Sequence, residues 1–527
     1  MKILFARCGA AEGGCKTMIQ DEVSLLPLKR SYIGKQLLFL ACIATLHVAP
    51  ALADVKLPAI IASHMVVQRD VPWHIWGTAT PGETVSVTFR GASLTTIADA
   101  SGHWNVDLAP GAAGGPFEMQ VRGENAIKLS DILVGDVWLA SGQSNMEFSM
   151  KQVKNAEAEL VAANRPRIRL FHVHRTSSDY PLEDASADPW TACSPESVAD
   201  FSAVAYFFGK EVQEHQNVPL GLIESSWGGT PAEAWTSLGA FSANASFMPI
   251  LAAYSKMADA EPAWLIERAR QDRETEAAKA AGKEVPYFPW HAELKSWAPA
   301  GDYNGMIAPL TRFPIRGVIW YQGESNTDPV RAPLYESSLA TLIQDWRQQW
   351  GEGDFPFLIV QIANFKTEPD AMWPEVREAQ RKVLALRNTG LAVTIDIGDP
   401  VNIHPTNKQE VGHRLALAAR AIAHSEKIEY SGPLYRQVTH EDHSLRVWFD
   451  HAASGLVAEG GVLKGFEIAG PDRHFVPADA YTDGATVVVS SAQVPSPEYV
   501  RYDWASSPEG NLYNKDVLPA SPFESQP

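Results

Sequence analysis

The sequence predicts an α/β protein, in which a mostly parallel sheet covered by helices is flanked along the chain by two β-rich regions. From about residue 129 to 425, apolar runs typical of buried strands alternate with helical patterns, as in parallel sheets whose two faces are covered. On either side, in 54–128 and 426–527, short alternating segments indicate antiparallel sheets instead. The chain has 527 residues, 45% of them hydrophobic and 20% charged, which suits roughly two to four folded domains.

The first 53 residues have the features of an export leader. Three basic residues precede the apolar run 37–48, whose length suits the core of a signal peptide, and small residues up to Ala53 suit a cleavage site. An uncleaved membrane anchor is the alternative, although this run is short for a span of about 20 residues. We therefore expect a mature chain that begins at Asp54, is periplasmic or secreted, and inserts no segment in a membrane.

The two flanking regions predict β structure. In residues 54–128, polar and apolar residues alternate over 84–89 between turn-forming segments rich in Gly and Pro, so we expect a small N-terminal β-sandwich. In residues 426–527, the alternation over 445–449 and the Val-rich run 487–489 predict a C-terminal β-rich region.

The middle region, 129–425, predicts the central sheet and its helices. The expected strands are residues 137–140, 168–173, 221–223, 318–321, 358–362 and 391–397. Between them, apolar residues recur at helical spacing in 201–212, 335–350 and 411–422. Residues 239–298 interrupt this alternation with a charged, Ala-rich run, which predicts an inserted helical hairpin that influences the choice of substrate.

Composition excludes several classes of partner. The formal net charge of −18 opposes binding to phosphate backbones, so we expect no nucleic-acid partner. Once the leader is removed, only Cys193 remains, which permits neither an internal disulfide nor a cysteine-based zinc site. The run 440–443 contains two histidines and two acids, but not the i, i+4 histidines of a zinc-protease helix. The sequence therefore predicts no metal and no cofactor, and it leaves the oligomeric state open.

Polar residues follow three of the predicted strands. Ser144 comes just after the run 137–140 in a turn that contains a glycine, residues 322–326 follow the fourth strand, and His404 follows the last strand, five residues after Asp399. Because parallel strands end at one edge of a sheet, these groups are expected at a common site. A nucleophilic serine needs a base to accept its proton and an acid to orient that base. Taken alone, however, Ser144 would as readily cap the following helix.

Four segments together resemble the sialate O-acetylesterase branch of the SGNH/GDSL-type carbohydrate esterases. They are Gly142-Gln143-Ser144-Asn145-Met146, Gly228-Gly229-Thr230, Gln322-Gly323-Glu324-Ser325-Asn326 and Asp399 to Asn407. Residues 64–70, 304–307 and 511–514 also resemble that group, so the likeness spans nearly the whole mature chain. It implies a flavodoxin-like, three-layer SGNH-hydrolase domain and hydrolysis of O-acetyl groups from sugars. The motif around Ser144 lacks the final glycine of the G-x-S-x-G elbow found in lipase-type hydrolases.

The resemblance also implies roles for individual residues. Ser144 would be the nucleophile and His404 the base, and Asp399, the nearest acid on the His404 side of the strand, is chosen as the acid. The remaining residues expected to bind the oxyanion or the substrate are Gln143, Gly228, Gly229, Gln322, Gly323, Glu324 and Asn326. One position departs from the family pattern, which commonly places the acid three residues before the histidine, where this chain has Val401. Asp396, Glu324 or a Ser-His pair without a carboxylate are therefore alternatives to Asp399.

The leading function is an exported carbohydrate O-acetylesterase that acts through an acetyl-enzyme. Its substrate would be acetylated sialic acid or an acetylated polysaccharide such as xylan, and the acidic chain disfavours the anionic sialate unless arginines line the site. A catalytically inert carbohydrate-binding protein and a broad-specificity lipase or thioesterase are the alternatives. Four tryptophans near the motifs would either stack on sugars or belong to the core: Trp138, Trp227, Trp235 and Trp320.

Overall fold

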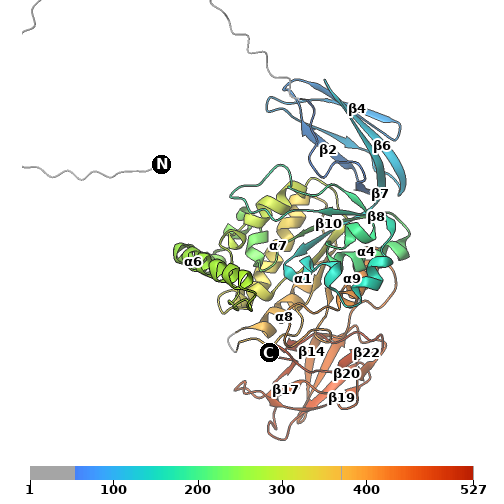
Figure 1. The fold of residues 1–527 in the computed structure, drawn as a ribbon. Coiled ribbons are helices and arrows are strands. Elements are labelled where there is room, and N and C mark those ends of the chain that lie inside the picture. The colour runs from blue at the N-terminus through green and yellow to red at the C-terminus, as the bar shows by residue number, and fades with distance from the viewer. Residues whose placement is uncertain (1–53, 369–370, 526–527) are drawn as a thin grey trace, which may run out of the picture. The chain divides into compact units, whose positions relative to one another are not determined.

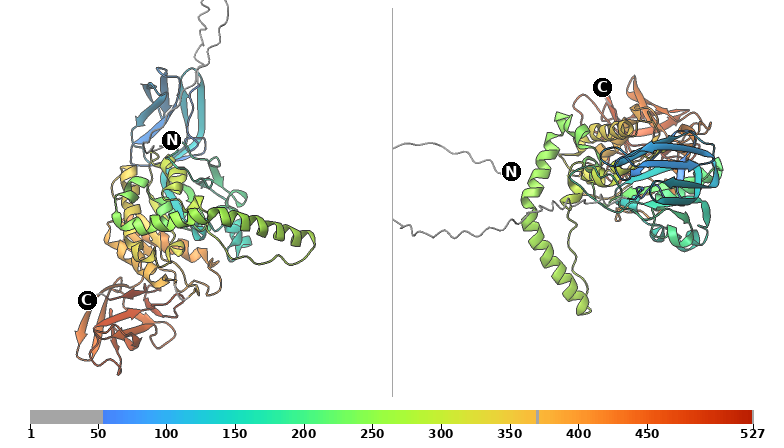
Figure 2. Two further views of the ribbon diagram at one scale, coloured as in Figure 1. Left: turned by 90° about the vertical axis from the view of Figure 1, so that its left-hand side faces the viewer. Right: turned by 90° about the horizontal axis from the view of Figure 1, so that it is seen from above.

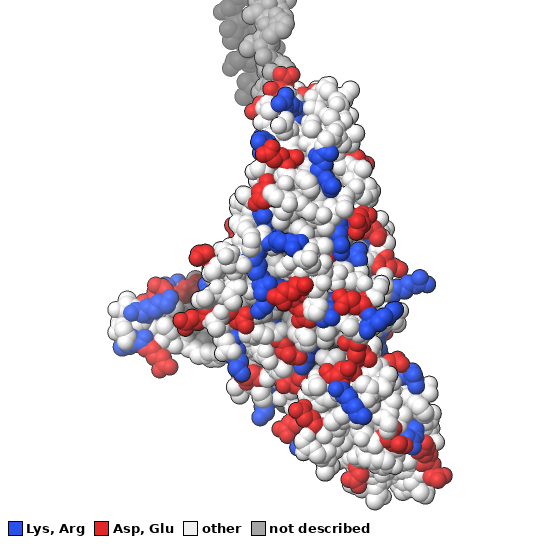
Figure 3. Space-filling model, turned by 90° about the vertical axis from the view of Figure 1, so that its right-hand side faces the viewer, with Lys and Arg blue, Asp and Glu red and all other residues white. Residues whose placement is uncertain are grey.

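The computed structural model describes residues 54–368 and 371–525 (Figure 1). The predicted leader and its cleavage near Ala53 lie outside the described residues. Within those two ranges, no helix combines the length and the apolar composition that a membrane span needs. On the face drawn in Figure 3, acidic and basic side chains are interspersed.

The central sheet has the strand order β13-β12-β11-β7-β10-β8-β9, and every neighbouring pair is parallel except the one with the edge strand β9. The strands are β7 (Ala126–Gly142), β8 (Arg165–His172), β9 (Thr191–Cys193), β10 (Leu220–Ser226), β11 (Gly317–Tyr321), β12 (Phe357–Val360) and β13 (Thr389–Ala392). All six predicted strands are present, which confirms the α/β class. The last one ends at Ala392 instead of Ile397, because the chain turns there, with the Ile397 N–H bonded to the Thr394 carbonyl.

Helices cover both faces of this sheet (Figure 1). α4 (Ala203–Gln216) and α9 (Lys408–Ile422) pack on one face, and α7 (Tyr335–Trp350) and α8 (Trp373–Lys382) pack on the other. The apolar stripes predicted in 201–212, 335–350 and 411–422 are the buried faces of α4, α7 and α9. Three short helices lie in the connections: α1 (Ser144–Glu147), α2 (Ala156–Val161) and α3 (Pro195–Val198).

The N-terminal β region shares a strand with the central sheet. Its strands are β1 (Val66–Gln68), β2 (Trp73–Thr78), β3 (Thr84–Phe89), β4 (Ala92–Ile97), β5 (His103–Leu108) and β6 (Gly114–Arg122). β2 pairs with β5, while β4, β3 and β6 form a second sheet that ends on β7, with β1 also paired to β7. The expected boundary at residues 128 and 129 therefore falls inside β7. Arg69 donates two hydrogen bonds of 2.8 and 2.9 Å to the fully buried Asp136 and fixes this junction.

The C-terminal region is β-rich, as predicted, and has its own apolar core. Its strands are β14 (Leu434–Glu441), β15 (Ser444–Asp450), β16 (Leu456–Ala458), β17 (Phe466–Ala469), β18 (Val476–Pro477), β19 (Asp479–Asp483), β20 (Thr486–Ser490), β21 (Tyr499–Tyr502), β22 (Leu512–Asn514) and β23 (Phe523–Glu524). The buried Arg377 of α8 joins this region to the central one by donating to the carbonyls of Ala505 and Ser506.

The segment that interrupts the alternation contains one long helix, so the prediction of a helical hairpin is wrong. After α5 (Leu238–Ser242), α6 runs through Met248–Ala280, and the described chain that returns from it contains no second α-helix, only the 3₁₀ turn Lys295–Trp297 (Figure 2). Gly282, with φ +62°, follows the end of α6, and Pro286 and Pro289 keep the returning chain out of a helix by removing backbone donors. Ile250 is the one fully buried residue of α6, among the described residues of that helix.

Gly142 allows β7 and β11 to approach each other directly before Ser144. Its φ is +136°, and a Cβ at this position would lie 2.1 Å from the Tyr321 carbonyl oxygen. The following N–H, that of Gln143, donates to the same carbonyl at 2.9 Å. A side chain at 142 would therefore separate the two strand ends that carry the polar motifs.

We expect Gly142→Ala to lower the free energy of unfolding by about 1–3 kcal/mol more than Gly461→Ala does, because only the first change forces two backbones apart. Gly461 is a matched control, since its φ is +118° and a Cβ there meets nothing within 4 Å. Urea unfolding of both variants measures the difference, and equal losses of stability would show that the close approach at Gly142 is not required.

Candidate active site

Ser144 and His404 meet at the carboxyl edge of the central sheet. Ser144 is the first residue of α1, immediately after β7, and His404 lies in the loop between β13 and α9. The Ser144 Oγ is 2.8 Å from the His404 Nε2, a hydrogen-bond distance between a hydroxyl and a general base. Both side chains line a cavity of about 830 Å³. The sequence placed both residues at this edge, and the structure brings them into contact.

The three acids considered for His404 have other partners. The Asp399 carboxylate accepts the backbone N–H of Val401 at 2.9 Å, and no hydrogen bond or ion pair joins it to His404 within the described ranges. Asp396 is bound by both terminal nitrogens of Arg414 at 2.6 Å. The choice of Asp399 as the acid therefore stays a prediction, and no contact supports it.

The amide of Asn145 connects the serine turn to the histidine loop. Its Nδ2 donates to the Ile403 carbonyl at 3.0 Å, next to His404, and to Glu324 Oε1 at 2.7 Å. Its Oδ1 accepts a hydrogen bond from Lys408 Nζ. Because an ammonium group only donates, Lys408 fixes which end of the amide faces Glu324 and Ile403.

Lys408 and Glu324 are buried ionisable groups on opposite sides of this amide. Lys408 is 0% exposed, and its Nζ lies 4.9 Å from the ring centre of Phe148 and 5.3 Å from that of Tyr321. Burial lowers the pKa of Lys408 to about 7, although the Glu324 charge opposes this shift. Burial raises the pKa of Glu324, and the second oxygen, Oε2, has no hydrogen-bond partner in the described part of the chain.

The environment of His404 favours the neutral imidazole. Burial, and then the charge of Lys408, hold the pKa of His404 below its usual value. A neutral ring accepts a proton from Ser144, whereas an imidazolium cannot. Lys408 was not predicted from the sequence, although its spacing from Val411 and Leu415 places it on the apolar face of α9.

Several of the other predicted residues support the rim of the cavity. Gln143 lines the cavity, and its Oε1 accepts the backbone N–H groups of Gly323 and Ser325 at 3.2 and 3.3 Å. Gln322 and Asn326 are fully buried and bonded to each other at 2.6 Å, below the cavity. These two side chains therefore brace the loop after β11 and do not face a bound substrate.

The two glycines after β10 lie against Ser144 and the cavity wall. A Cβ at Gly228 would be 3.2 Å from the Ser144 Cβ, so glycine leaves room beside Ser144. The Gly228 N–H, which was expected to bind the oxyanion, donates to Glu147 Oε2 at 2.9 Å. Gly229 has φ +79°, and a Cβ there would lie 2.6 Å from the ring of Trp290.

Aromatic side chains from α6 and from the chain that follows it form one wall of the cavity. Trp264 and His291 stack with ring centres 3.7 Å apart, and Trp290 and Trp297 lie beside them. Of the four tryptophans named from the sequence, Trp227 lines the cavity, whereas the others are 0% exposed core residues: Trp138, Trp235 and Trp320.

The charged residues of the cavity are mostly acidic. Arg175 donates to Glu147 at 2.6 Å, and Arg268 donates to Glu293 at 3.2 Å. The cavity is lined by these two arginines and by four acids: Glu147, Glu293, Glu324 and Asp328. Among the described residues that line the cavity, both arginines are thus already paired with a carboxylate.

Comparison with known proteins decides the family. The family model described as carbohydrate esterase, sialic acid-specific acetylesterase, matches residues 134–259 and 292–421. The sialate O-acetylesterase of Mus musculus is 31% identical over 526 residues, which cover 89% of this chain and 94% of the mouse protein. The chain belongs to this carbohydrate esterase family.

Two further relatives agree with this assignment. The Homo sapiens sialate O-acetylesterase is 32% identical over 426 residues, 73% of the esterase and 74% of the human protein. The crystal structure of a carbohydrate acetylesterase from Xanthomonas citri is 39% identical, with a TM-score of 0.78, and the match covers 90% of the esterase and 99% of that chain. The resemblance that the motifs suggested is thereby confirmed, and the esterase is a hydrolase of carbohydrate esters.

Only some of the residues around the cavity lie in the part of the chain that the family model matches. Ser144, Asn145, Glu324 and His404 lie inside the matched residues, whereas 260–291 is left out of the match. That segment supplies the following cavity residues: Trp264, Arg268, Trp290 and His291.

We expect Lys408→Met to raise the pKa of His404, because it removes a nearby positive charge that opposes protonation of the imidazole. The acidic limb of the kcat/KM profile should then move to higher pH. Titration of the His404 ring by NMR, with Lys427→Met as a control at an exposed lysine, checks this. Identical His404 titrations in the wild type and in Lys408→Met would contradict it.

Proposed function

We propose that the esterase removes O-acetyl groups from carbohydrates, with Ser144 as nucleophile and His404 as general base. The 2.8 Å contact between Ser144 Oγ and His404 Nε2, at the floor of a cavity with aromatic walls, is the observation that carries this proposal. The family relationship supports the same chemistry.

The reaction would proceed through an acetyl-enzyme. Ser144 Oγ attacks the acetyl carbonyl while its proton passes to His404 Nε2, and His404 then gives that proton to the oxygen of the departing sugar. In the second half, His404 takes a proton from water, and the resulting hydroxide attacks the acetyl group. Acetate leaves, and the proton on His404 returns to Ser144 Oγ.

We propose that His404 works as a Ser-His pair positioned through Asn145 and Lys408, without a carboxylate bonded to its ring. Asn145 holds the Ile403 carbonyl and follows Ser144 directly, so it fixes the two catalytic residues relative to each other. The lowered pKa of His404 favours the neutral ring, which is the form that accepts the Ser144 proton.

The oxyanion would be bound at the start of α1. The Ser144 N–H occupies the first helical position, where no helical acceptor precedes it. Gln143 adds a second donor, since its Oε1 is held by two backbone N–H groups and its Nε2 belongs to a residue that lines the cavity. One such donor is worth about 10²–10³ in rate. The Gly228 N–H would contribute only if Glu147 moved.

We also propose that the chain consists of a central hydrolase domain between two β-rich regions. If the edge strand β8, which lies between β7 and β10 in the chain, is left out of the numbering, then β10, β7, β11, β12 and β13 have the flavodoxin-like order 2-1-3-4-5, which supports an SGNH-hydrolase domain over about 129–425. β8 and β9 extend this sheet at the β10 edge. The β-rich regions 54–128 and 426–527 would flank it in an exported protein whose leader ends near Ala53.

The cavity supports a neutral acetylated glycan, such as acetylated xylan, over an acetylated sialic acid. A sialate carboxylate needs an available cation, and Arg175 and Arg268 are each paired with a glutamate. Tryptophan faces suit the apolar faces of uncharged sugar rings, and the acids that line the cavity outnumber the arginines.

Ser144→Ala should lower kcat/KM for an aryl acetate by at least about 10³-fold, because the nucleophile is lost. Asp399→Asn should lower it by less than about tenfold, because its carboxylate does not contact His404. Acetate release by the two purified variants, matched in thermal unfolding, makes the comparison. A loss near the 10⁴-fold of a triad acid in Asp399→Asn would restore Asp399 to the mechanism and contradict the Ser-His pair.

Acetate release should be faster, in kcat/KM, from acetylated xylan than from 9-O-acetyl sialic acid. Glu293→Gln should shift this ratio toward sialic acid, because it frees Arg268 from its carboxylate partner. Glu336→Gln, at an acid outside the cavity, serves as the control. A wild-type preference for sialic acid would contradict the neutral-substrate assignment while leaving the acetylesterase activity intact.

A further inference from the structure

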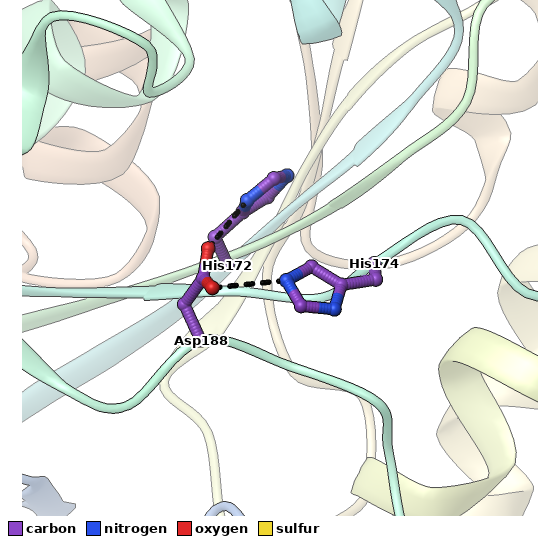
Figure 4. Close-up of side chains that lie close together, drawn as sticks. All are labelled: His172, His174 and Asp188. Atoms are coloured by element: carbon purple, nitrogen blue, oxygen red, sulfur yellow. Dashed lines mark hydrogen bonds and ion pairs between the residues drawn. The ribbon is translucent and has the colours of Figure 1, made fainter.

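Three ligand-type side chains lie together beside the last residues of β8, away from the catalytic pair. His172 ends β8, His174 follows it, and Asp188 lies on the chain that returns toward β9 (Figure 4). The Asp188 N–H donates to the His172 carbonyl at 2.9 Å, and the His174 N–H donates to the Ser186 carbonyl at 2.8 Å. This short antiparallel pairing puts the three side chains on one face.

The pairing also holds the backbone of the cluster against the core. Val173 forms a bridge with Ala187, and its side chain is 1% exposed. Because side chains alternate along extended chain, a buried Val173 turns His172 and His174 to the opposite, accessible side. Three side chains from two paired segments are thus positioned before any ligand arrives.

The ligand atoms are close to the spacing that a tetrahedral ion imposes. Asp188 Oδ2 lies 3.1 Å from His172 Nδ1, and Asp188 Oδ1 lies 3.0 Å from His174 Nε2. All three ligand atoms lie within 4.8 Å of one another. Bonds of about 2.0–2.2 Å to zinc place neighbouring ligand atoms about 3.3 Å apart. The imidazoles are 42% and 46% exposed and have room to rotate and close the remaining gap.

The His174 ring has a hydrogen-bond partner at the nitrogen that faces away from Asp188, as metal-binding histidines usually do. His174 Nδ1 lies 3.2 Å from Ser186 Oγ, opposite the Nε2 that faces Asp188. A hydrogen bond from Nδ1–H to the serine leaves the Nε2 lone pair available for a cation and orients the ring.

We propose that His172, His174 and Asp188 bind a divalent transition-metal ion, with Zn²⁺ as the best match to two imidazoles and one carboxylate. Three protein ligands leave one tetrahedral position for water. This metal site is separate from the Ser144 and His404 pair, whose proposed chemistry needs no metal ion.

A metal at this place would close the base of the loop that borders the cavity. Between His174 and Asp188 the chain carries Arg175, which pairs with Glu147, and Ser177, whose Oγ donates to the Lys295 carbonyl. Glu147 in turn holds the Gly228 N–H beside Ser144. A metal ion that binds the folded state alone raises the stability of that state.

Titration of the untagged, chelator-treated protein with ZnCl₂ by calorimetry tests the proposal. We expect one equivalent to bind the wild type and to raise its Tm. Asp188→Asn and His174→Gln should each weaken this binding by more than about tenfold, and Ser186→Ala by about 10–100-fold through its effect on His174. His443→Gln is the control, because it removes an exposed histidine outside the cluster, whose Nδ1 faces the Pro495 carbonyl.

Two outcomes would overturn the proposal. One is the absence of a one-equivalent site in the wild type, and the other is unchanged affinity in Asp188→Asn. Far-UV circular dichroism establishes that each variant is folded, and absorption of bound Co²⁺ reports imidazole ligation in the variants that bind. Since none of these measurements uses acetyl ester hydrolysis, the result is independent of the proposed esterase mechanism.

Discussion

The amide of Asn145 is the interaction on which the geometry of the active site depends. It joins the turn that carries Ser144 to the loop that carries His404, although the two residues are far apart in the sequence. Lys408 sets its orientation, and Glu324 takes its second hydrogen. The side chains of Asn145, Lys408 and Glu324 are buried. The loss of one of them therefore leaves a hydrogen-bonding group of another unsatisfied, at a cost of about 1–3 kcal/mol. Catalytic geometry and local stability are therefore maintained by the same contacts.

The sequence was sufficient for the parts of the fold and of the site that depend on short-range patterns. Apolar runs predicted all six strands of the parallel sheet, because strands buried on both faces have few polar residues. Ser144 and His404 were placed correctly because each directly follows a strand or the turn after it, and parallel strands end at one edge. The family motifs added the chemistry that these positions serve.

What the sequence did not predict depends on the three-dimensional surroundings. Lys408 was overlooked because a charged residue is usually exposed, and only the packing of α9 shows it buried. Asp399 was chosen as the orienting acid by its proximity in the chain, and this choice stays a prediction, since its carboxylate accepts the Val401 N–H. The cluster of His172, His174 and Asp188 arises from a returning loop, which no local motif encodes. The aromatic wall likewise comes from a charged segment whose tryptophans follow no periodic pattern.

β7 belongs to two sheets, and this has a consequence for how the chain can evolve. One end of the strand pairs with β6 in the N-terminal region, and the other ends next to Ser144 between β10 and β11. A single-residue insertion between the two ends would move each side chain of β7 beyond the insertion to the opposite face of the sheet. The N-terminal region is therefore not a detachable module that recombination can swap at an arbitrary junction, because its last strand sets the register of Ser144.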